Sequence, residues 1–229
     1  MKAINADFTF YHIEKCAGSS LRTILNEYFL NIYKKDEIII PGTKYGNKNI
    51  NLMEKYHEEL IKIYDFSKIK VVLSHMYYEN MYINTSKFKF TCVRNPVDRV
   101  ISHYYFFDYK YYNKHLNELT DSELDKVLKK NCIVHKLSTN RSRDLNQAKE
   151  NSKKFDYIMI YENFNNDLKE LNILLNNRFE CDIDMKIHID NKTSLNYKKY
   201  ITTNLKKKIE KLCSKDMELY NFICNNKKR

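Results

Sequence analysis

Residues 8–22 read FTFYHIEKCAGSSLR, from Phe8 to Arg22, and the rest of the chain is organised around them. Phe8 to Ile13 is a run of aromatic and β-branched residues, which predicts a buried strand. A helix is predicted from Ser19 or Ser20 onward, because apolar residues then recur on one helical face: Leu21, Ile24, Leu25, Tyr28, Phe29 and Ile32. A strand, a tight loop and a helix in this order form a geometry that binds phosphate.

The loop between the two elements carries the residue types of an anion site. The first turn of a helix has backbone N–H groups without partners and a partial positive charge. Gly18 removes a Cβ where an anion must approach the backbone, Ser19 and Ser20 add hydroxyl donors, and Lys15 adds a full charge. The stretch therefore predicts an anion-binding loop. Taken alone, it also fits a tight turn with an incidental lysine.

This loop differs from the common nucleotide-binding loop. A Walker A motif reads G-x-x-x-x-G-K-[ST], with its lysine after the second glycine. Here Lys15 precedes Gly18 by three residues, and the loop has no second glycine. An ordinary kinase or ATPase is therefore disfavoured.

Composition narrows the class of partner. A chain of 229 residues favours one domain over residues 1–229, and its net charge of +11 fits a polyanionic partner. Nucleic acid, an acidic membrane or polysaccharide, and a multiply phosphorylated small molecule all remain open. The six cysteines have neither zinc-ligand nor C-x-x-C spacing, so we expect free thiols and no metal site. With no signal peptide or apolar span, we expect a soluble, cytoplasmic protein.

Strands and helices alternate along the remaining sequence. Further strands are predicted over Glu37 to Ile40, Lys70 to Leu73, Phe88 to Val93 and Tyr157 to Tyr161. Helices are predicted over residues 50–64, from Pro96 onward, over residues 121–130 with Thr120 or Asp121 as cap, from Phe164 to about Leu175, and from about Thr203 to Phe222. Residues 131–155 are polar without a clear pattern, and residues 188–200 look irregular. The alternation predicts a single α/β domain with a mainly parallel central sheet flanked by helices.

Two further strand ends carry polar residues. The strand at residues 70–73 ends at Ser74-His75, and the carboxyl ends of strands face the ligand crevice in open α/β sheets. The strand at residues 88–93 runs into Arg94-Asn95-Pro96, where proline suits the first turn of a helix. Arg99 and Ser102 follow on that helix. A second strand-to-helix junction thus gathers cationic and hydroxyl groups.

With both junctions considered, the sequence resembles the sulfotransferases that use 3′-phosphoadenosine 5′-phosphosulfate (PAPS), and most of all their carbohydrate branch with the heparan-sulfate 2-O, chondroitin and HNK-1-type enzymes. The family pattern F-x-H-I-P-K-[CT]-[AG]-G-[ST]-S is similar to Phe10 to Ser20, and R-[DN]-P-x-x-R-x-x-S-x-Y to Arg94 to Tyr104. Weaker similarity covers Phe155 to Leu171 and Asp216 to Tyr220. The resemblance implies the P-loop-like sulfotransferase fold. Glu14 replaces the usual proline, and we expect its side chain to point away from the anion site.

The resemblance also implies roles for individual residues. It assigns the 5′-phosphosulfate to Lys15, Gly18, Ser19, Ser20 and the backbone of Leu21, and the 3′-phosphate to Arg94 and Ser102. Arg22 either assists at the first group or is an exposed helix residue. Arg99 either forms a structural salt bridge or lies near the nucleotide.

Sulfuryl transfer to an alcohol requires relief of charge on the leaving phosphate and removal of the acceptor proton. Lys15 suits the first task, because its charge can sit near the bridging oxygen. His75 is the candidate general base, since related 2-O-sulfotransferases have a histidine base in a comparable segment, and Glu79 is the substitute. His12, inside the predicted strand, is interpreted as structural. No metal is implied.

The implied acceptor is a hydroxyl of a saccharide or glycoconjugate. Aromatic and basic residues either line a groove for an acidic sugar or only pack: Tyr77, Tyr78, Tyr104, Tyr105 and Lys110. The competing hypotheses are a basic nucleic-acid-binding protein, although no recognition motif gathers the charge, and a nucleotide-phosphate kinase of related fold. Without the membrane anchor of Golgi relatives, we expect a bacterial or viral cytosolic enzyme, or a catalytic domain of a longer protein.

Overall fold

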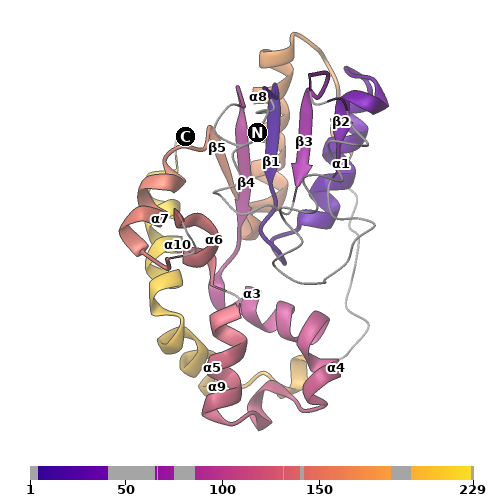
Figure 1. The fold of residues 1–229 in the computed structure, drawn as a ribbon. Coiled ribbons are helices and arrows are strands. Elements are labelled where there is room, and N and C mark those ends of the chain that lie inside the picture. Colours follow the sequence, from indigo (N-terminus) through magenta and orange to yellow (C-terminus); the bar gives the residue numbers. More distant parts are fainter. Residues whose placement is uncertain are drawn as a thin grey trace.

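Five parallel strands form the centre of the structure, a computed structural model that describes residues 5–40, 65, 67–74, 86–130, 132–139, 142–186 and 197–227. The strands are β1 (Phe8–Tyr11), β2 (Ile38–Ile39), β3 (Val71–Ser74), β4 (Lys89–Val93) and β5 (Tyr157–Ile160). Their order in the sheet is β2-β3-β1-β4-β5, and every neighbouring pair is parallel (Figure 1). The prediction of a single α/β domain with a mainly parallel sheet is confirmed.

The register of the sheet brings the ends of β1 and β3 to one level, and β4 runs two residues further, to Val93. Tyr11, the last residue of β1, pairs with Ser74 of β3 on one side and with Thr91 of β4 on the other. The Thr91 hydroxyl also donates to the Tyr11 carbonyl over 2.7 Å. The carboxyl ends of β1, β3 and β4 therefore lie at the same edge of the sheet.

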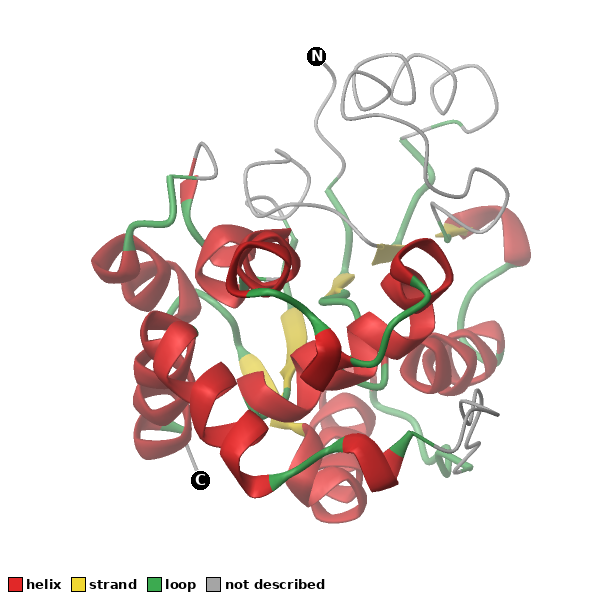
Figure 2. Ribbon diagram, turned by 90° about the horizontal axis from the view of Figure 1, so that it is seen from below, coloured by secondary structure: helices red, strands yellow, loops and turns green. Residues whose placement is uncertain are grey.

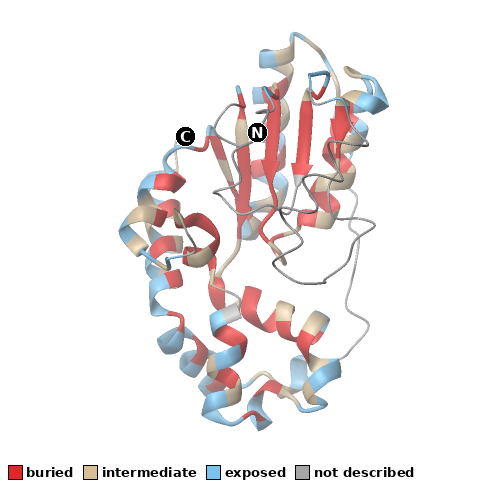
Figure 3. Ribbon diagram, in the orientation of Figure 1, coloured by how far each residue is buried: buried red, intermediate tan, exposed pale blue. Residues whose placement is uncertain are grey.

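One group of helices packs beside the sheet. It comprises α1 (Gly18–Leu30), α6 (Ile133–Leu137), α7 (Leu145–Ser152), α8 (Phe164–Phe179) and α10 (Ser214–Asn226). α1 contacts β3, α8 contacts β5, and α10 contacts α6 and α7. The apolar face predicted for α1 is confirmed for Leu21, Ile24, Leu25, Tyr28 and Phe29, which are buried, whereas Ile32 lies beyond the end of the helix. Figure 3 shows how burial concentrates in the strands and on the inner sides of these helices.

A second group of helices lies beyond the carboxyl ends of the strands (Figure 1). It consists of α3 (Pro96–His103), a π-helical turn (Tyr104–Asp108), α4 (Tyr109–Tyr112), α5 (Asp121–Lys130) and α9 (Thr203–Leu212). These helices share a hydrophobic cluster of their own. Seen from below, they lie in front of the strands (Figure 2). They face the edge of the sheet where a ligand is expected.

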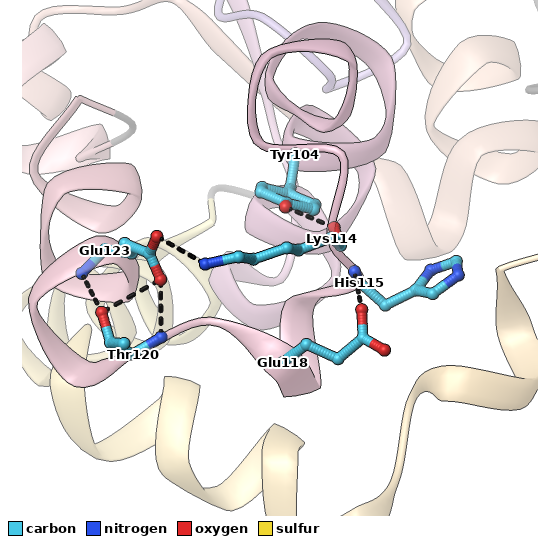
Figure 4. A network of polar contacts seen from close by, with 6 residues as sticks. All are labelled: Tyr104, Lys114, His115, Glu118, Thr120 and Glu123. Atoms are coloured by element: carbon cyan, nitrogen blue, oxygen red, sulfur yellow. Dashed lines mark hydrogen bonds and ion pairs between the residues drawn. The ribbon is translucent and has the colours of Figure 1, made fainter.

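Polar contacts fix the turn between α4 and α5 (Figure 4). The Tyr104 hydroxyl donates to the Lys114 carbonyl over 2.7 Å, and the Lys114 amine contacts Glu123 at 3.0 Å. Thr120 and Glu123 form a reciprocal cap, in which the Thr120 N–H donates to the carboxylate and the Glu123 N–H donates to the hydroxyl. Thr120, rather than Asp121, is therefore the cap of α5.

Several predicted elements differ in the structure. The predicted helix from Thr203 to Phe222 is two helices, because α9 buries Leu205 and Ile209 in the second cluster while α10 buries Leu219 and Ile223 in the main core. One straight helix cannot serve both, and the chain bends at Cys213. α8 runs on to Phe179, and the unassigned residues 131–155 contain α6 and α7.

Other predictions cannot be compared with the structure. The helix predicted over residues 50–64 and most of the irregular stretch predicted over residues 188–200 lie outside the described residues. Among the helices that the structure describes, none combines the length and the apolar character needed to cross a membrane.

Candidate active site

The loop at the carboxyl end of β1 has the backbone form of an anion cradle. Lys15 (φ 64°) and Ala17 (φ 59°) are both left-handed although neither is glycine, a conformation that costs about 1–2 kcal/mol per residue. Ala17 is followed directly by Gly18, the first residue of α1. A left-handed residue before a right-handed one turns successive N–H groups into one concavity, which binds anions. The strained backbone at Lys15 and Ala17 thus arranges the N–H donors of the loop in a concave row.

Not every N–H group assigned to this cradle is available. The Leu21 N–H donates to the Ala17 carbonyl over 2.9 Å, within the helix, and the Leu21 side chain lies in the core. Gly18, Ser19 and Ser20 precede it in the first turn, where N–H groups lack helical acceptors. The donors of α1 therefore come from Gly18, Ser19 and Ser20.

The buried His12 ring leaves no room for a side chain at Gly18. A Cβ on Gly18 would lie 1.4 Å from Nε2 and 1.7 Å from Cδ2 of His12. The buried His12 ring stacks on Phe10, with ring centroids 5.6 Å apart, and fills the space that a side chain at position 18 would need. The imidazole therefore excludes a Cβ at position 18, and the structural interpretation of His12 is supported.

The Lys15 amine lies over an aromatic ring. Its Nζ is 3.7 Å from the ring centroid of Phe106, in the π-helical turn after α3. Burial lowers the pKa of Lys15, and the nearby Arg94 lowers it further. Phe106 carries no signal of its own in the sequence, because nothing in a run of aromatic residues marks the one that contacts a loop so distant along the chain.

Arg94 joins the second junction to the first. Its Nη1 donates to the Lys15 carbonyl over 3.3 Å, and its guanidinium lies 4.3 Å from the ring centroid of Tyr161. Asn95 caps α3, since its side chain accepts from the Val97 N–H over 3.0 Å. The two strand-to-helix junctions predicted to bind the donor therefore contact each other.

Arg99 and Ser102 lie on α3, and Arg99 reaches from there to the loop after β1. Arg99 is 1% exposed, and its Nη1 donates to the Glu14 carbonyl over 3.3 Å. Within the described residues no carboxylate forms an ion pair with it, so the predicted alternative of a structural salt bridge is wrong there. Ser102, three residues later, is buried.

The carboxylate of Glu14 is engaged away from these donors. It forms an ion pair of 2.9 Å with the buried Lys136 of α6, whose carbonyl accepts from the Tyr11 hydroxyl over 2.7 Å. The negative charge that the sequence places in the loop is thereby neutralised, in keeping with the expectation that this side chain turns away.

Two more side chains of the first junction are buried. Cys16 is inaccessible, and burial raises its pKa to about 12, so its thiol is not a nucleophile near neutral pH. Arg22 is half-buried, burial lowers its pKa, and its Nε and Nη1 have no hydrogen-bond partner. The alternative that Arg22 is merely an exposed helix residue is wrong.

A histidine–carboxylate pair lies one residue beyond Ser102. His103 Nδ1 is 3.2 Å from Asp108 Oδ2, and both residues are largely buried. Their spacing of five residues would separate them on an α-helix, whereas the π-helical turn Tyr104–Asp108 brings them together. No sequence pattern predicts this turn, so the pair could not be found from spacing.

The proposed base and the proposed groove are only partly described. His75 and Glu79, with Tyr77 and Tyr78, lie outside the described residues. Tyr104 and Tyr105 are buried in the second cluster and do not line a groove. The exposed Lys110 lies over Tyr111, its Nζ 4.9 Å from the ring centroid.

In the part of the chain that the structure describes, no group of three or more His, Cys, Asp or Glu side chains is placed to hold a metal ion. Three cations lie at the loop: Lys15, Arg94 and Arg99. Of the nearby carboxylates, Glu14 is paired with Lys136, and Glu162 accepts from the Asn95 N–H over 2.9 Å. Such a donor set suits an anionic ligand.

Comparison with known proteins agrees with this geometry. No curated protein matches the sequence. The structure resembles a crystal structure of a sulfotransferase from Alicyclobacillus acidocaldarius, with a TM-score of 0.52, 14% identity and 96% of each chain covered. It also resembles the crystal structure of mouse sulfotransferase SULT7A1 complexed with PAP, with a TM-score of 0.51, 13% identity, and 95% of this chain and 86% of the other covered. At these identities the likeness shows the fold alone. The model of the sulfotransferase family matches residues 5–223, and the chain therefore belongs to the sulfotransferase family.

Proposed function

We propose that this sulfotransferase transfers a sulfuryl group from PAPS to a hydroxyl of a saccharide or glycoconjugate. The observation that carries the proposal is the contact between Arg94 and the Lys15 carbonyl, which unites two cationic strand-to-helix junctions in one site. PAPS bears anionic groups at its 5′ and 3′ positions. Buried guanidinium groups with unused N–H donors, together with a left-handed loop before α1, fit such a ligand.

Each group of residues has a proposed task. Gly18, Ser19 and Ser20 offer first-turn donors to the 5′-phosphosulfate, with Leu21 closing the turn through its bond to Ala17. In the overall reaction the acceptor oxygen bonds to sulfur as the bond from sulfur to the bridging phosphate oxygen breaks. Lys15 holds its charge at that oxygen.

The second junction has the complementary task. Arg94 and Ser102 bind the 3′-phosphate, with Tyr161 packed against the Arg94 guanidinium. His75 receives the proton of the acceptor hydroxyl, and Glu79 is the alternative base. This part of the proposal comes from the sequence.

The acceptor class rests on charge and aromatic surface. The chain has a net charge of +11, which favours an acidic saccharide. Phe106 is 46% exposed and Tyr111 is 76% exposed, both on the segment that reaches Lys15, and exposed aromatic rings offer flat apolar faces to a sugar. We further propose a cytoplasmic location and no resident metal; all six cysteines are free in the structure.

The test is calorimetric titration with the desulfated product, 3′-phosphoadenosine 5′-phosphate (PAP), on the wild type and on Arg94→Ala. We expect micromolar binding that is lost in the variant, followed by transfer of radiolabelled sulfate from PAPS in a screen of neutral and acidic oligosaccharides. Folded wild-type protein that does not bind PAP would overturn the proposal. PAP binding with sulfation only of non-carbohydrate alcohols would overturn the acceptor class alone.

A further inference from the structure

Arg99 is a buried cation whose charge is not balanced by a carboxylate in the described structure. It is the largest of the fully buried side chains among the described residues, and it is 1% exposed. Its Nη1 donates to the Glu14 carbonyl over 3.3 Å, while its Nε and Nη2 have no hydrogen-bond partner among the residues that the structure describes. Burial of an unpaired charge destabilises the folded state. We therefore expect a function of Arg99 that offsets this cost.

The contact with Glu14 fixes the orientation of one peptide group. A trans peptide is planar, and its C=O and N–H point in opposite directions. Because the Glu14 carbonyl points to Arg99, the N–H of Lys15 points away from Arg99. The Lys15 carbonyl is held in turn by Arg94 at 3.3 Å.

The two arginines thus hold the peptides on both sides of the Lys15 Cα. Lys15 has a φ of 64°, which is unfavourable for a residue with a side chain. A strained residue keeps such a conformation only where its surroundings impose it. Arg94 and Arg99 supply that constraint, and they reach the loop from a junction 79 and 85 residues further along the chain.

We propose that Arg99 is a positioning residue for the anionic donor. It holds the Glu14–Lys15 peptide so that the Lys15 N–H faces the bound 5′-phosphate group, and the donor supplies the negative charge that the buried guanidinium lacks. The inference rests on the proposed function, because it takes the anion to be the donor. It gives Arg99 a role separate from that of Arg94.

The proposal makes an unusual prediction for Arg99→Met. Methionine fills much of the same space without charge, so the ligand-free protein should unfold at the same temperature as the wild type or at a higher one. PAP affinity should fall about 10- to 100-fold, as for loss of a hydrogen-bonded charge, and the rise in unfolding temperature that PAP produces should shrink accordingly. Arg99→Lys keeps the charge without the planar fork and should lie between the two.

Arg178→Met is the matched control. Arg178 also donates to a backbone carbonyl, that of Lys87 at 2.8 Å, but on the exposed surface of α8. It should leave PAP affinity unchanged. Thermal unfolding and calorimetry with PAP are measured on all four proteins.

The outcomes separate the two proposals. A wild type that does not bind PAP overturns the proposed function. A wild type that binds PAP, with Arg99→Met equal to it in affinity, overturns the role of Arg99 alone. An Arg99→Met protein that fails to fold, or unfolds at a lower temperature without ligand, makes Arg99 a structural residue and also overturns the inference.

Discussion

Arg94 donates a hydrogen bond of 3.3 Å to the backbone carbonyl of Lys15, across 79 residues of sequence. The contact is possible because β1 and β4 are neighbours in the sheet, and β4 runs two residues beyond the level at which β1 ends, so that Arg94 follows it directly. Arg94, which is proposed to bind the 3′-phosphate of the donor, thereby holds the loop that is proposed to bind the 5′-phosphosulfate. Four predictions test the site around this contact.

Lys15→Met should lower the turnover number for sulfuryl transfer about 10²- to 10³-fold, because it removes the charge proposed to stabilise the bridging oxygen. PAP affinity should change less than turnover. The acceptor found in the oligosaccharide screen serves for the rate measurement. Lys153→Met is the control, since the exposed Lys153 also lies over an aromatic ring, with its Nζ 5.8 Å from the ring centroid of Phe222. Equal rate losses in both variants would contradict the role of Lys15.

Gly18→Ala should destabilise the protein by about 1–3 kcal/mol, because the new Cβ overlaps the His12 ring. The double variant His12→Ala/Gly18→Ala should be more stable than the sum of the two single changes predicts, since removal of the ring frees the space. Urea unfolding of the four proteins gives the coupling energy, which we expect at about 0.5–3 kcal/mol. Additive effects would show that the two positions do not compete for space.

His75→Asn should lower turnover about 10²- to 10⁴-fold while PAP affinity stays at the wild-type value, because a general base acts on the acceptor and not on the donor. Glu79→Gln, measured in parallel, should retain most activity. The reverse pattern would move the base to Glu79. Full activity in both variants would place the proton acceptor elsewhere.

Stability should fall with pH below about 6.5, and His103 should contribute to the fall. Burial lowers the pKa of His103, and the charge of Arg99 lowers it further. The contact with Asp108 and the charge of Glu14 oppose this shift. The unfolded chain, with an ordinary pKa of about 6.5, therefore takes up a proton that the folded state resists, and folding is disfavoured as pH falls.

His103→Gln removes this contribution. Urea unfolding at pH 7.5 and at pH 5.5 should show a smaller loss of stability for the variant than for the wild type. An equal or larger loss in the variant would mean that the Asp108 contact outweighs burial.

Local sequence patterns were enough for much of the fold. The aromatic and β-branched run at residues 8–13 predicts β1, and the spacing of Leu21, Ile24 and Leu25 predicts the buried face of α1. These patterns work because the period of side chains along a strand or helix follows from its backbone alone. Pro96 marks the start of α3 for the same local reason.

Longer-range packing decided where local patterns misled. The bend at Cys213 arises because α9 and α10 bury their apolar faces in different clusters, which no property of residues 203–222 reveals. The π-helical turn at Tyr104–Asp108, and with it the contact between His103 and Asp108, is equally invisible in the spacing.

The sequence by itself determined the residue types of the site: a lysine, a glycine and two serines at one strand end, and an arginine and a serine at another. Only the tertiary structure decided what each one touches. The His12 ring occupies the space beside Gly18, the Lys15 amine lies over the Phe106 ring, and the Glu14 carbonyl accepts a hydrogen bond from Arg99. The physical reason is that strand pairing and helix packing bring together side chains from distant parts of the chain, and contacts of that kind leave no periodic trace in the sequence.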